Sequence, residues 1–376
     1  MTTVAIIGGR LQGTEAVYLA KKAGMRSILI DKDPKTPASG FCDELHVFDV
    51  REMAPRMITL LKKSDFILPA LENDEVHSAL MKIAGEHGIN MAFDAQAYAV
   101  TSSKLRSDGL MREHNIPAPR YYPECGGPYI IKPSDDSGST GVIKAGSADE
   151  VKLFLAEADD PENWVVQEYL EGPSYSIEIV GLPGMYRTYA ITEIHMADDY
   201  DCRMVTAPCK LSGSNDEIFS DIAKSLASMV NLTGIMDVEV IEHKGALKVL
   251  EIDARIPSQT PVVVYHSMGV NLLSELADIT LEGRFKSEIK NKSGFAAIEH
   301  YLIDEAGVHH KGEHIMVEGR PLSLKENFFG ADEAITDYDG GRLPWRGMFI
   351  NSGETREELD GKRNEMLHML NAERAP

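Results

Sequence analysis

The sequence is poor in cysteine and in long apolar runs, and each shortage excludes a class of protein. Its four cysteines, Cys42, Cys125, Cys202 and Cys209, form no CxxC pair, so neither a disulfide framework nor a cysteine zinc site is expected. No apolar run reaches the roughly 18 residues of a membrane-spanning helix, and the opening residues do not resemble a signal peptide. We therefore expect a cytoplasmic protein with no membrane partner.

Basic residues are scarce relative to acidic ones, which limits the ligands. The 376-residue chain has 59 Asp and Glu against 38 Lys and Arg, a formal net charge of -21. Such a surface repels a phosphate backbone, so no nucleic-acid partner is predicted and small-molecule substrates are favoured. An anionic ligand must then be held by a few local lysines, arginines and backbone amides.

The pattern of apolar residues predicts α/β and α+β parts in one multidomain chain. Residues 1–93 alternate short strands, such as 4–7 and 27–31, with helical patterns, which indicates right-handed βαβ crossovers and a parallel, Rossmann-like sheet. From Trp164 onward the sequence is richer in strands, with helices between or after them.

A glycine turn, Gly8-Gly9-Arg10-Leu11-Gln12-Gly13, follows the first strand. A dinucleotide fingerprint, G-x-G-x-x-G, needs glycine where Arg10 stands, because the pyrophosphate approaches the backbone there. Asp31, at the end of the second strand, keeps a nicotinamide oxidoreductase open as an alternative. The turn is otherwise a plain strand-to-helix connection, or a site whose amides hold a small anion such as an amino acid carboxylate.

A second feature is a lysine, Lys132, that leaves an apolar strand and enters a loop of small residues containing Ser137, Gly138 and Ser139. Such a loop can close its amides over phosphates while the ammonium neutralises their oxygens. The lysine precedes the glycines, so this is not a Walker A loop. A polar hairpin loop with an incidental lysine is the alternative interpretation of this loop alone.

Two features flank this loop and strengthen the nucleotide interpretation. A second lysine, Lys104, opens the expected helix 103–114 upstream. Downstream, the strand from Gln167 to Leu170 runs out to a turn, and its edge can offer main-chain groups to an adenine ring. Each feature is weak alone, but their order along the chain is informative.

The most informative segment is a pair of expected strands within residues 234–255. Alternation places Glu251 and Asp253 on one face, and Glu239 on the neighbouring strand can face them. Carboxylates on apolar strands are costly unless cations satisfy them, and hard oxygen ligands suit Mg2+ that bridges phosphate oxygens. Arg255 faces the same side, where it can hold a phosphoryl group. The alternative is a solvent-facing acidic strand face.

Glu72 lies just after the expected strand 65–69, at the edge where ligands of open α/β sheets collect. Its carboxylate is a candidate to grip a substrate ammonium. A plain helix N-cap region is an equally good interpretation of this segment.

Taken in order, these features resemble the ATP-grasp superfamily over about residues 1–285. The resemblance implies an ATP-grasp fold behind an N-terminal Rossmann-like domain, with Lys132 and Arg255 as catalytic residues, Arg255 steadying an acyl phosphate. Two Mg2+ ions are expected at Glu239, Glu251 and Asp253. The expected contacts to ATP are Lys104, Lys132, Ser137, Gly138, Ser139, Gln167, Glu168, Tyr169 and Leu170.

Two positions depart from the family's pattern. Asp253 stands where an Asn is often found, which still permits metal binding. Ser174 stands where a Glu often binds the ribose hydroxyls, so Glu178 is suggested for that contact instead.

The opening segment 8–25 and the segment 71–74 are similar to a narrower family, the ligases of pyrrolysine biosynthesis. That family joins 3-methyl-D-ornithine to the side-chain amine of L-lysine, and its glycine turn helps to hold an amino acid. This resemblance implies substrate contacts at Leu11, Gln12, Glu72, Arg255 and Ser258.

Four segments are expected on this basis. Residues 1–93 form the substrate-binding Rossmann-like domain and 94–165 a small lobe with the phosphate lid. Residues 166–290 form a large lobe with the metal site, on which a mixed segment, 291–376, packs.

The function predicted is an ATP-dependent carboxylate–amine ligase that forms an amide through an acyl phosphate, with small amino acids as partners. Another ATP-grasp ligase, of amino acid or purine-precursor metabolism, is the alternative in the same class. An NAD-dependent oxidoreductase and a non-catalytic nucleotide-binding regulator are alternatives of other classes. A homodimer is compatible with the sequence.

Overall fold

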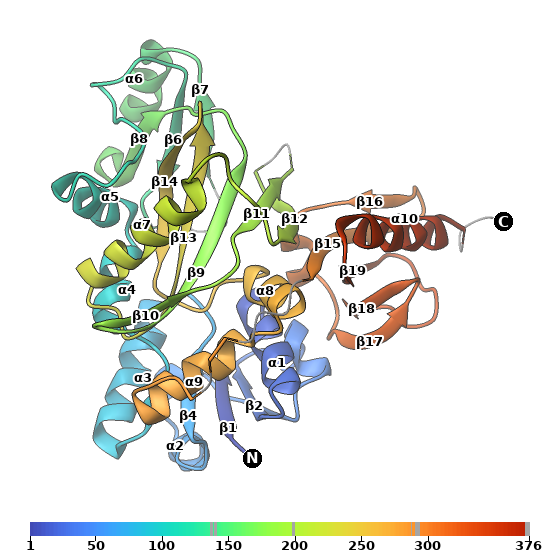
Figure 1. The fold of residues 1–376 in the computed structure, drawn as a ribbon. Helices are drawn as coiled ribbons and strands as arrows, with labels where there is room; N and C mark the ends of the chain where they lie inside the picture. Colours follow the sequence, from blue (N-terminus) through green and yellow to red (C-terminus); the bar gives the residue numbers. More distant parts are fainter. Residues whose placement is uncertain (136–137, 139–140, 198–199, 287, 290–293, 373–376) are drawn as a thin grey trace.

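The computed structural model describes residues 1–135, 138, 141–197, 200–286, 288–289 and 294–372, and these form three sheets. Figure 1 shows a parallel sheet with its helices at one end of the molecule and a small sheet at the opposite end. A large sheet runs between them, and the C-terminal segment projects to one side. Among the described residues, no helix has the length and apolar character needed to cross a membrane.

The parallel sheet has the strand order β3-β2-β1-β4-β5. Its central strands are apolar and buried on both faces because helices cover them, as expected of a parallel sheet. Asn73 begins the helix after β4 by accepting a hydrogen bond from the Val76 amide. The elements are β1 Thr3–Ile7, α1 Leu11–Lys22, β2 Arg26–Asp31, β3 Glu44–Val47, α2 Pro55–Leu61, β4 Phe66–Pro69, α3 Asp74–His87 and β5 Asn90–Met91, with short 3-10 turns at Pro37–Gly40 and Val50–Glu52.

The small sheet is antiparallel, in the order β7-β6-β8. Its central strand carries Lys132, and the helix that begins at Lys104 precedes this strand in the chain. Its elements are α4 Ala95–Thr101, α5 Lys104–Glu113, β6 Tyr129–Pro133, β7 Ile143–Ala145, α6 Ala148–Glu157, a 3-10 turn Pro161–Asn163 and β8 Trp164–Glu168.

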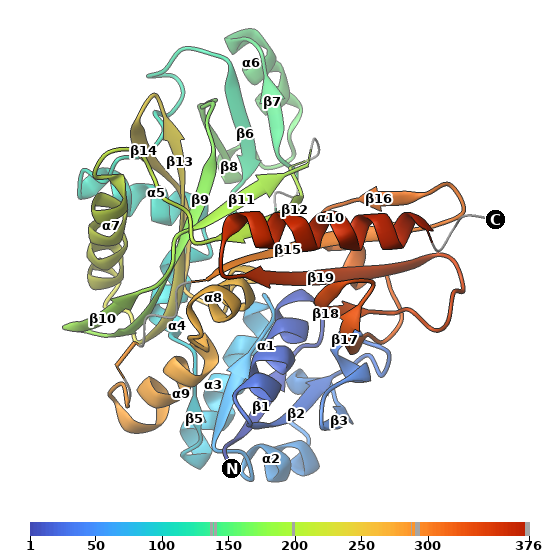
Figure 2. The same ribbon diagram turned by 45° about the vertical axis from the view of Figure 1, so that its right-hand side comes forward.

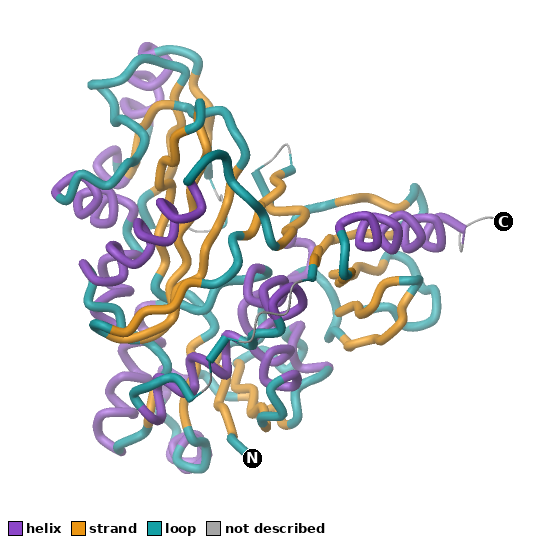
Figure 3. Tube along the Cα trace, in the orientation of Figure 1, coloured by secondary structure: helices purple, strands orange, loops and turns teal. Residues whose placement is uncertain are grey.

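The large sheet has 11 strands, with the main order β14-β13-β9-β11-β12-β15-β19-β18-β17. Figure 3 shows its long strands with helices beside them. The strands are β9 Ser174–Leu182, β10 Met185–Thr188, β11 Thr192–Met196, β12 Cys202–Ala207, β13 Gly234–His243, β14 Ala246–Asp253, β15 Phe295–Ile303, β16 Val308–His310, β17 Ser323–Phe328, β18 Ala331–Thr336 and β19 Trp345–Gly353. The helices are α7 Asn215–Met229, α8 Thr260–Met268, α9 Leu272–Glu282 and α10 Arg356–Ala372, with a 3-10 turn at Glu313–Val317.

The prediction of a parallel α/β part followed by an α+β part is confirmed. The segment after residue 291 does more than pack on the large lobe, because β15 pairs with β12 and extends the same sheet. Figure 2 shows α10 lying along β15 and β19.

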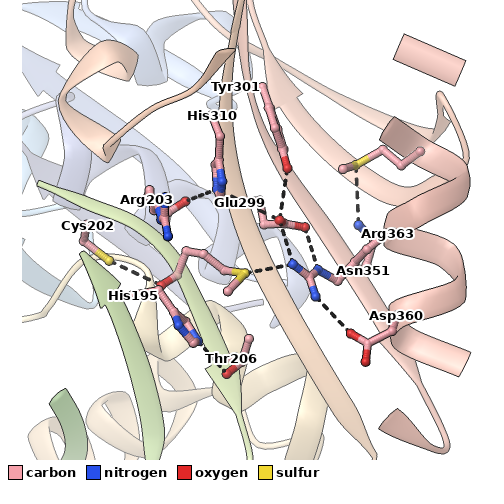
Figure 4. A network of polar contacts seen from close by, with 12 residues as sticks. His195, Cys202, Arg203, Thr206, Glu299, Tyr301, His310, Asn351, Asp360 and Arg363 are labelled. Atoms are coloured by element: carbon pink, nitrogen blue, oxygen red, sulfur yellow. Dashed lines mark hydrogen bonds and ion pairs between the residues drawn. The ribbon is translucent and has the colours of Figure 1, made fainter. Parts of the chain in front are cut away.

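A buried ion pair fixes α10 to this sheet (Figure 4). Arg363 donates from Nε and Nη2 to the two carboxylate oxygens of Glu299, at 2.8 and 2.9 Å. Tyr301 donates its hydroxyl to the same carboxylate at 3.1 Å, and Glu299 is only 1% exposed. Both oxygens of this buried carboxylate are therefore paired.

One core joins the N-terminal domain to the large sheet. Apolar side chains of α1, α8 and α9 lie in the same buried cluster as strands of the C-terminal segment. At its edge the Tyr18 hydroxyl lies 2.6 Å from His266 Nε2 and donates to Glu333 at 2.6 Å. This packing fixes the parallel sheet beside the end of β14, which positions the site described next.

Candidate active site

Two lysines of the small lobe meet the acidic strands of the large sheet. Lys104 Nζ lies 2.9 Å from Glu251 Oε1, and Lys132 Nζ donates to the Leu250 carbonyl at 3.2 Å. Burial lowers the pKa of Lys132, against the opposing charges of Glu251 and Asp108. The sequence-based expectation that these lysines and acidic strands face one cleft therefore agrees with their positions.

Between them lies a cavity of about 180 Å3. Both lysines line it together with Glu239 and Glu251 from β13 and β14, and so do the end of β8 and the residues after it. The cavity is lined by Lys104, Ile130, Lys132, Pro133, Val142, Gln167, Glu168, Tyr169, Leu170, Ser174, Met196, Tyr200, Glu239, Ile241, Leu250 and Glu251.

The segment expected to bind adenine, Gln167 to Leu170, lies at the end of β8 and lines this cavity. The amides of Glu168 and Tyr169 donate to the carbonyls of Arg120 and Pro128, both at 2.8 Å. The Glu168 carboxylate pairs with the Arg120 guanidinium at 2.9 Å, so its charge is satisfied away from the cavity. Leu170 lines the cavity next to these two residues.

Carboxylates of three neighbouring strands form two rows on the face of the sheet below this cavity. Glu239 pairs in register with Glu251, and Asp237 pairs with Asp253. On the other side of β13, Asp237 lies opposite Glu178 of β9. A β-bulge after Glu239 shifts the register only beyond these pairs, so the predicted alternation holds where it matters.

Burial makes these carboxylates hard to ionise. It raises the pKa of Glu239 to about 7, with Glu251 adding to the shift, and that of Asp253 to about 7 despite nearby Arg255. Burial and the neighbouring acids also raise the pKa of Asp237 well above its ordinary value. Within the described part of the chain, Glu178, Asp237 and Asp253 each have one buried oxygen with no hydrogen-bond partner. The carboxylates on this face of the sheet therefore have too little positive charge nearby to ionise together.

Arg255 bridges this face and the N-terminal domain. Its Nε lies 2.8 Å from Asp253 Oδ2 and its Nη2 lies 2.8 Å from Glu72 Oε1. Burial opposes the charged guanidinium, but Asp253 and Glu72 outweigh it and raise the pKa of Arg255. Glu72 Oε1 also accepts a hydrogen bond from Gln12 Nε2 at 2.8 Å. Glu72, Asp253, Lys104 and Glu251 line a cavity of about 310 Å3 next to the first one.

The glycine turn opens on a larger cavity of about 630 Å3. Leu11, Gln12 and Glu72, the residues expected to hold an amino acid, all line it. Asp31 also lines it, but its carboxylate accepts the amides of Gly9 and Asp33, both at 2.8 Å. Each oxygen of Asp31 therefore accepts one amide and holds the glycine turn in place.

A small cavity of about 100 Å3 adjoins the first cavity and shares Glu239 and Glu251 with it. Ser258, an expected substrate residue, lines it together with Gln259 at the start of α8. Gln259 has φ +61, a strained backbone held by a hydrogen bond from its amide to Glu15 of α1. Glu313 also lines this cavity, with one oxygen unpartnered among the described atoms, and burial raises its pKa.

The remaining expected residues are placed as follows. Ser137 and Ser139 lie outside the described residues. Gly138, with φ +60, lines the small cavity, and a Cβ on it would come within 3.0 Å of the His314 ring. Glu178, suggested for the ribose, is fully buried within the sheet and does not line the first cavity, whereas Ser174 does.

Comparison with known proteins adds the family. Residues 101–259 match the ATP-grasp domain family. A 3-methyl-D-ornithine–L-lysine ligase of Methanosarcina acetivorans is 38% identical over 308 residues, which cover 82% of this chain and 81% of that protein. The chain belongs to this ligase family. The enzyme of the same name from Methanosarcina mazei is 34% identical over 98% of this chain and 96% of its own length.

The fold of this ligase family member is shared more widely. The N5-carboxyaminoimidazole ribonucleotide synthetase, solved as an ADP complex, superposes with a TM-score of 0.72 at 14% identity, covering 100% of this chain and 98% of that one. Together with the domain match, this confirms the predicted ATP-grasp fold behind a parallel-sheet domain. At such low identity the likeness concerns the fold alone.

The carboxylate groups of the site in this ligase family member are of the kind that bind Mg2+. No three His, Cys, Asp or Glu side chains of the described residues are arranged around one metal position. Mg2+ is ordinarily held by one or two carboxylates together with substrate phosphates, so a preformed cage is not required. Glu239 and Glu251 supply such oxygens in the lining of the cavity. Asp253 lies two residues after Glu251 on β14 and pairs with Arg255.

Sequence reasoning missed two acidic residues of this ligase family site. Asp237 stands two residues before Glu239 and shares its face, so the alternation that was applied to Glu251 could have found it. Glu313 comes from the C-terminal segment, where no motif marks it, and only the folded chain brings it to the small cavity.

Proposed function

We propose that this chain is an ATP-dependent ligase that joins the carboxylate of 3-methyl-D-ornithine to the side-chain amine of L-lysine. The observation that carries the proposal is the cavity in which Lys104 and Lys132 face Glu239 and Glu251, in a chain related over most of its length to ligases of that name. Amide formation of this kind is the function predicted from the sequence.

ATP is proposed to occupy the first cavity. Aliphatic side chains such as Ile130, Ile241 and Leu250 can cover the adenine faces. The two amides before Leu170 are already hydrogen-bonded, so we expect the Leu170 amide to bind the ring. Lys104 and Lys132 then reach the phosphates, where their charges match those of the oxygens.

Two Mg2+ ions are proposed at Glu239, Glu251 and Asp253. When bound there, Mg2+ neutralises negative charge on the phosphates during transfer. The buried, hard-to-ionise carboxylates support this assignment, because a cation removes the penalty of ionising them together. The chain's own cations, Lys104, Lys132 and Arg255, contribute in the same direction.

The reaction is proposed to run in two displacements. A carboxylate oxygen of the first amino acid attacks the γ-phosphorus of ATP, the bond to the β–γ bridging oxygen breaks, and ADP leaves. The neutral amine of lysine then attacks the acyl carbon, the bond from carbon to the phosphate oxygen breaks, and the proton lost by the nitrogen passes to the departing phosphate. Phosphate leaves and an amide remains, so catalysis is mostly positioning and electrostatics.

The cavities next to the nucleotide suggest where each amino acid binds. The carboxylate substrate is proposed at Ser258, which lines the small cavity next to the one proposed for the nucleotide. Lysine is proposed in the cavity of Leu11, Gln12 and Glu72, with its side chain directed toward Arg255. Acidic residues in both cavities suit substrates with ammonium groups.

The experiment is a pairwise screen of amino acids with Mg-ATP, read by mass for a condensation product and by coupled assay for ADP. We expect amide product and ADP in equal amounts from 3-methyl-D-ornithine and L-lysine, and neither without ATP. ATP binding with no substrate-stimulated ADP would instead support a nucleotide-binding regulator. Product only with purine precursors would support the alternative ligase class.

We propose a cytoplasmic location, a homodimer, and the four-segment division at residues 93, 165 and 290. Sedimentation equilibrium at micromolar concentration checks the dimer, and limited proteolysis checks the boundaries.

A further inference from the structure

The guanidinium of Arg255 is held by groups from two different sheets. Its Nη2 and Nε lie 2.8 Å from Glu72 and from Asp253, and Nη1 donates to the Ile256 carbonyl at 3.3 Å. Glu72 follows β4 of the parallel sheet, whereas Asp253 ends β14 of the large sheet. In this state two nitrogens of the guanidinium lie at ion-pair distance from carboxylates and the third donates to a carbonyl, although Nε makes no hydrogen bond among the described atoms. A phosphoryl group that binds Nη2 must displace Glu72.

Glu72 stands where two cavities meet. It lines the 630 Å3 cavity of the glycine turn and the 310 Å3 cavity that reaches Lys104 and Glu251. Its Oε1 contacts both Gln12 and Arg255. A single carboxylate oxygen therefore links the proposed lysine-binding residues to the residue expected on the phosphoryl group.

An ammonium group bound at Glu72 competes with Arg255 for the same negative charge. The two side chains are only 14% and 27% exposed, so water screens them weakly and loss of a partner is costly. When Glu72 binds an ammonium group, the guanidinium of Arg255 loses one of its two carboxylate partners. Its affinity for a phosphoryl group, whose oxygens match the geometry of a guanidinium, therefore rises. By linkage, a phosphoryl group on Arg255 frees Glu72 for the ammonium to the same extent.

We propose that the Glu72–Arg255 ion pair is an exchangeable contact that couples binding of the amine substrate to acyl-phosphate formation. Glu72 is then a positioning residue for Arg255 as well as a contact of the amine substrate. The inference rests on the proposed function. With the carboxylate substrate alone, Arg255 stays on Glu72 and little ATP is consumed; when lysine binds, Arg255 is released toward the phosphoryl group.

The test compares ADP release with 3-methyl-D-ornithine alone and with added lysine, in the unaltered protein and in Glu72→Gln. The amide keeps the shape of Glu72 but removes its charge, so Arg255 is free from the start. We expect ADP release without lysine to rise about 10-fold and its stimulation by lysine to fall by a similar factor, within the usual range of coupling between sites. An unchanged rate without lysine, with only a higher KM for lysine, would mean that Glu72 binds the amine and nothing more.

Glu75→Gln is the matched control, because Glu75 is a carboxylate three residues after Glu72 that pairs with Arg51 and not with Arg255. We expect no change in the KM for lysine and no rise in ADP release without lysine. A rise equal to that of Glu72→Gln would overturn the coupling. If the unaltered protein makes no condensation product, the proposed function itself is wrong; if it does and Glu72→Gln behaves as the control, only the coupling is wrong.

Discussion

Buried carboxylates in two regions of the large sheet differ in whether all their oxygens have hydrogen-bond partners. Glu299 on β15 has both oxygens paired with Arg363, and Tyr301 adds a third hydrogen bond (Figure 4). On β9, β13 and β14, by contrast, Glu178, Asp237 and Asp253 each have an oxygen without a partner among the described atoms, and their pKa values are raised by burial. The first group holds the fold together, while the second carries an electrostatic cost that a bound cation can relieve.

The largest expected effect is on turnover, at the acidic strands of the proposed active site. Glu251 lines the proposed nucleotide cavity and the two cavities next to it, and pairs with Lys104. Glu251→Gln should lower the rate of lysine-dependent ADP release by about 1,000-fold, a loss of about 4 kcal/mol of transition-state stabilisation. Steady-state kinetics with both amino acids measures it.

Glu242→Gln is the control for this change. Glu242 lies on β13 but is outside the lining of these cavities, so its replacement should alter the rate by less than about twofold. Near-normal turnover in Glu251→Gln would remove Glu251 from the mechanism.

The second effect concerns the stability that the paired carboxylate, Glu299, gives to the fold. Glu299→Gln leaves Arg363 facing an amide, and we expect a loss of roughly 2–4 kcal/mol in the free energy of unfolding, reduced because 23% of the Arg363 side chain is exposed. Urea denaturation measures this loss, and turnover below the transition should stay close to normal.

Asp360→Asn provides the comparison, since Asp360 also pairs with Arg363 but is 48% exposed. Its replacement should cost less than about 1 kcal/mol. If the two variants were equally destabilised, burial would not be what makes the Glu299 contact strong.

A smaller effect concerns pH. Burial raises the pKa of Glu178 to about 7, well above the ordinary value of a glutamate. The unfolded chain therefore loses this proton at lower pH than the folded chain, and the folded state becomes less stable as pH rises from about 4.5 to 7. Above that window the penalty is complete, and below it the penalty is absent.

Glu178→Gln should remove this penalty without changing the shape of the side chain. In the ligand-free protein we expect it to stabilise the fold at pH 8 by on the order of 2–3 kcal/mol and to have little effect at pH 5. Thermal unfolding at the two pH values checks this difference, and destabilisation at pH 8 would show that the charge of Glu178 is compensated in the folded state.

Local pattern predicted much of the site, because its key residues lie on regular strands. Two-residue alternation related Glu251 to Asp253, and the strand end at Lys132 predicted a lysine facing phosphates. The order of these motifs was enough to assign the ATP-grasp fold, which is confirmed. The roles of the individual residues stay predictions.

Long-range packing set the rest. Glu313 reaches its cavity only because the C-terminal strands extend the large sheet through the β12–β15 pairing. The contact between Glu72 and Arg255 depends on how two sheets lie against each other, which neither local sequence encodes. The suggestion of Glu178 for the ribose rested on position along one strand, from which its full burial beside Asp237 of β13 was not visible.

The central claim, activation of a carboxylate as an acyl phosphate in this cleft, has a direct test. 3-Methyl-D-ornithine labelled with 18O in both carboxylate oxygens is converted with Mg-ATP and lysine, and the released phosphate is analysed by mass. We expect one 18O atom in each phosphate formed together with amide. Amide formation with unlabelled phosphate would exclude an acyl-phosphate intermediate.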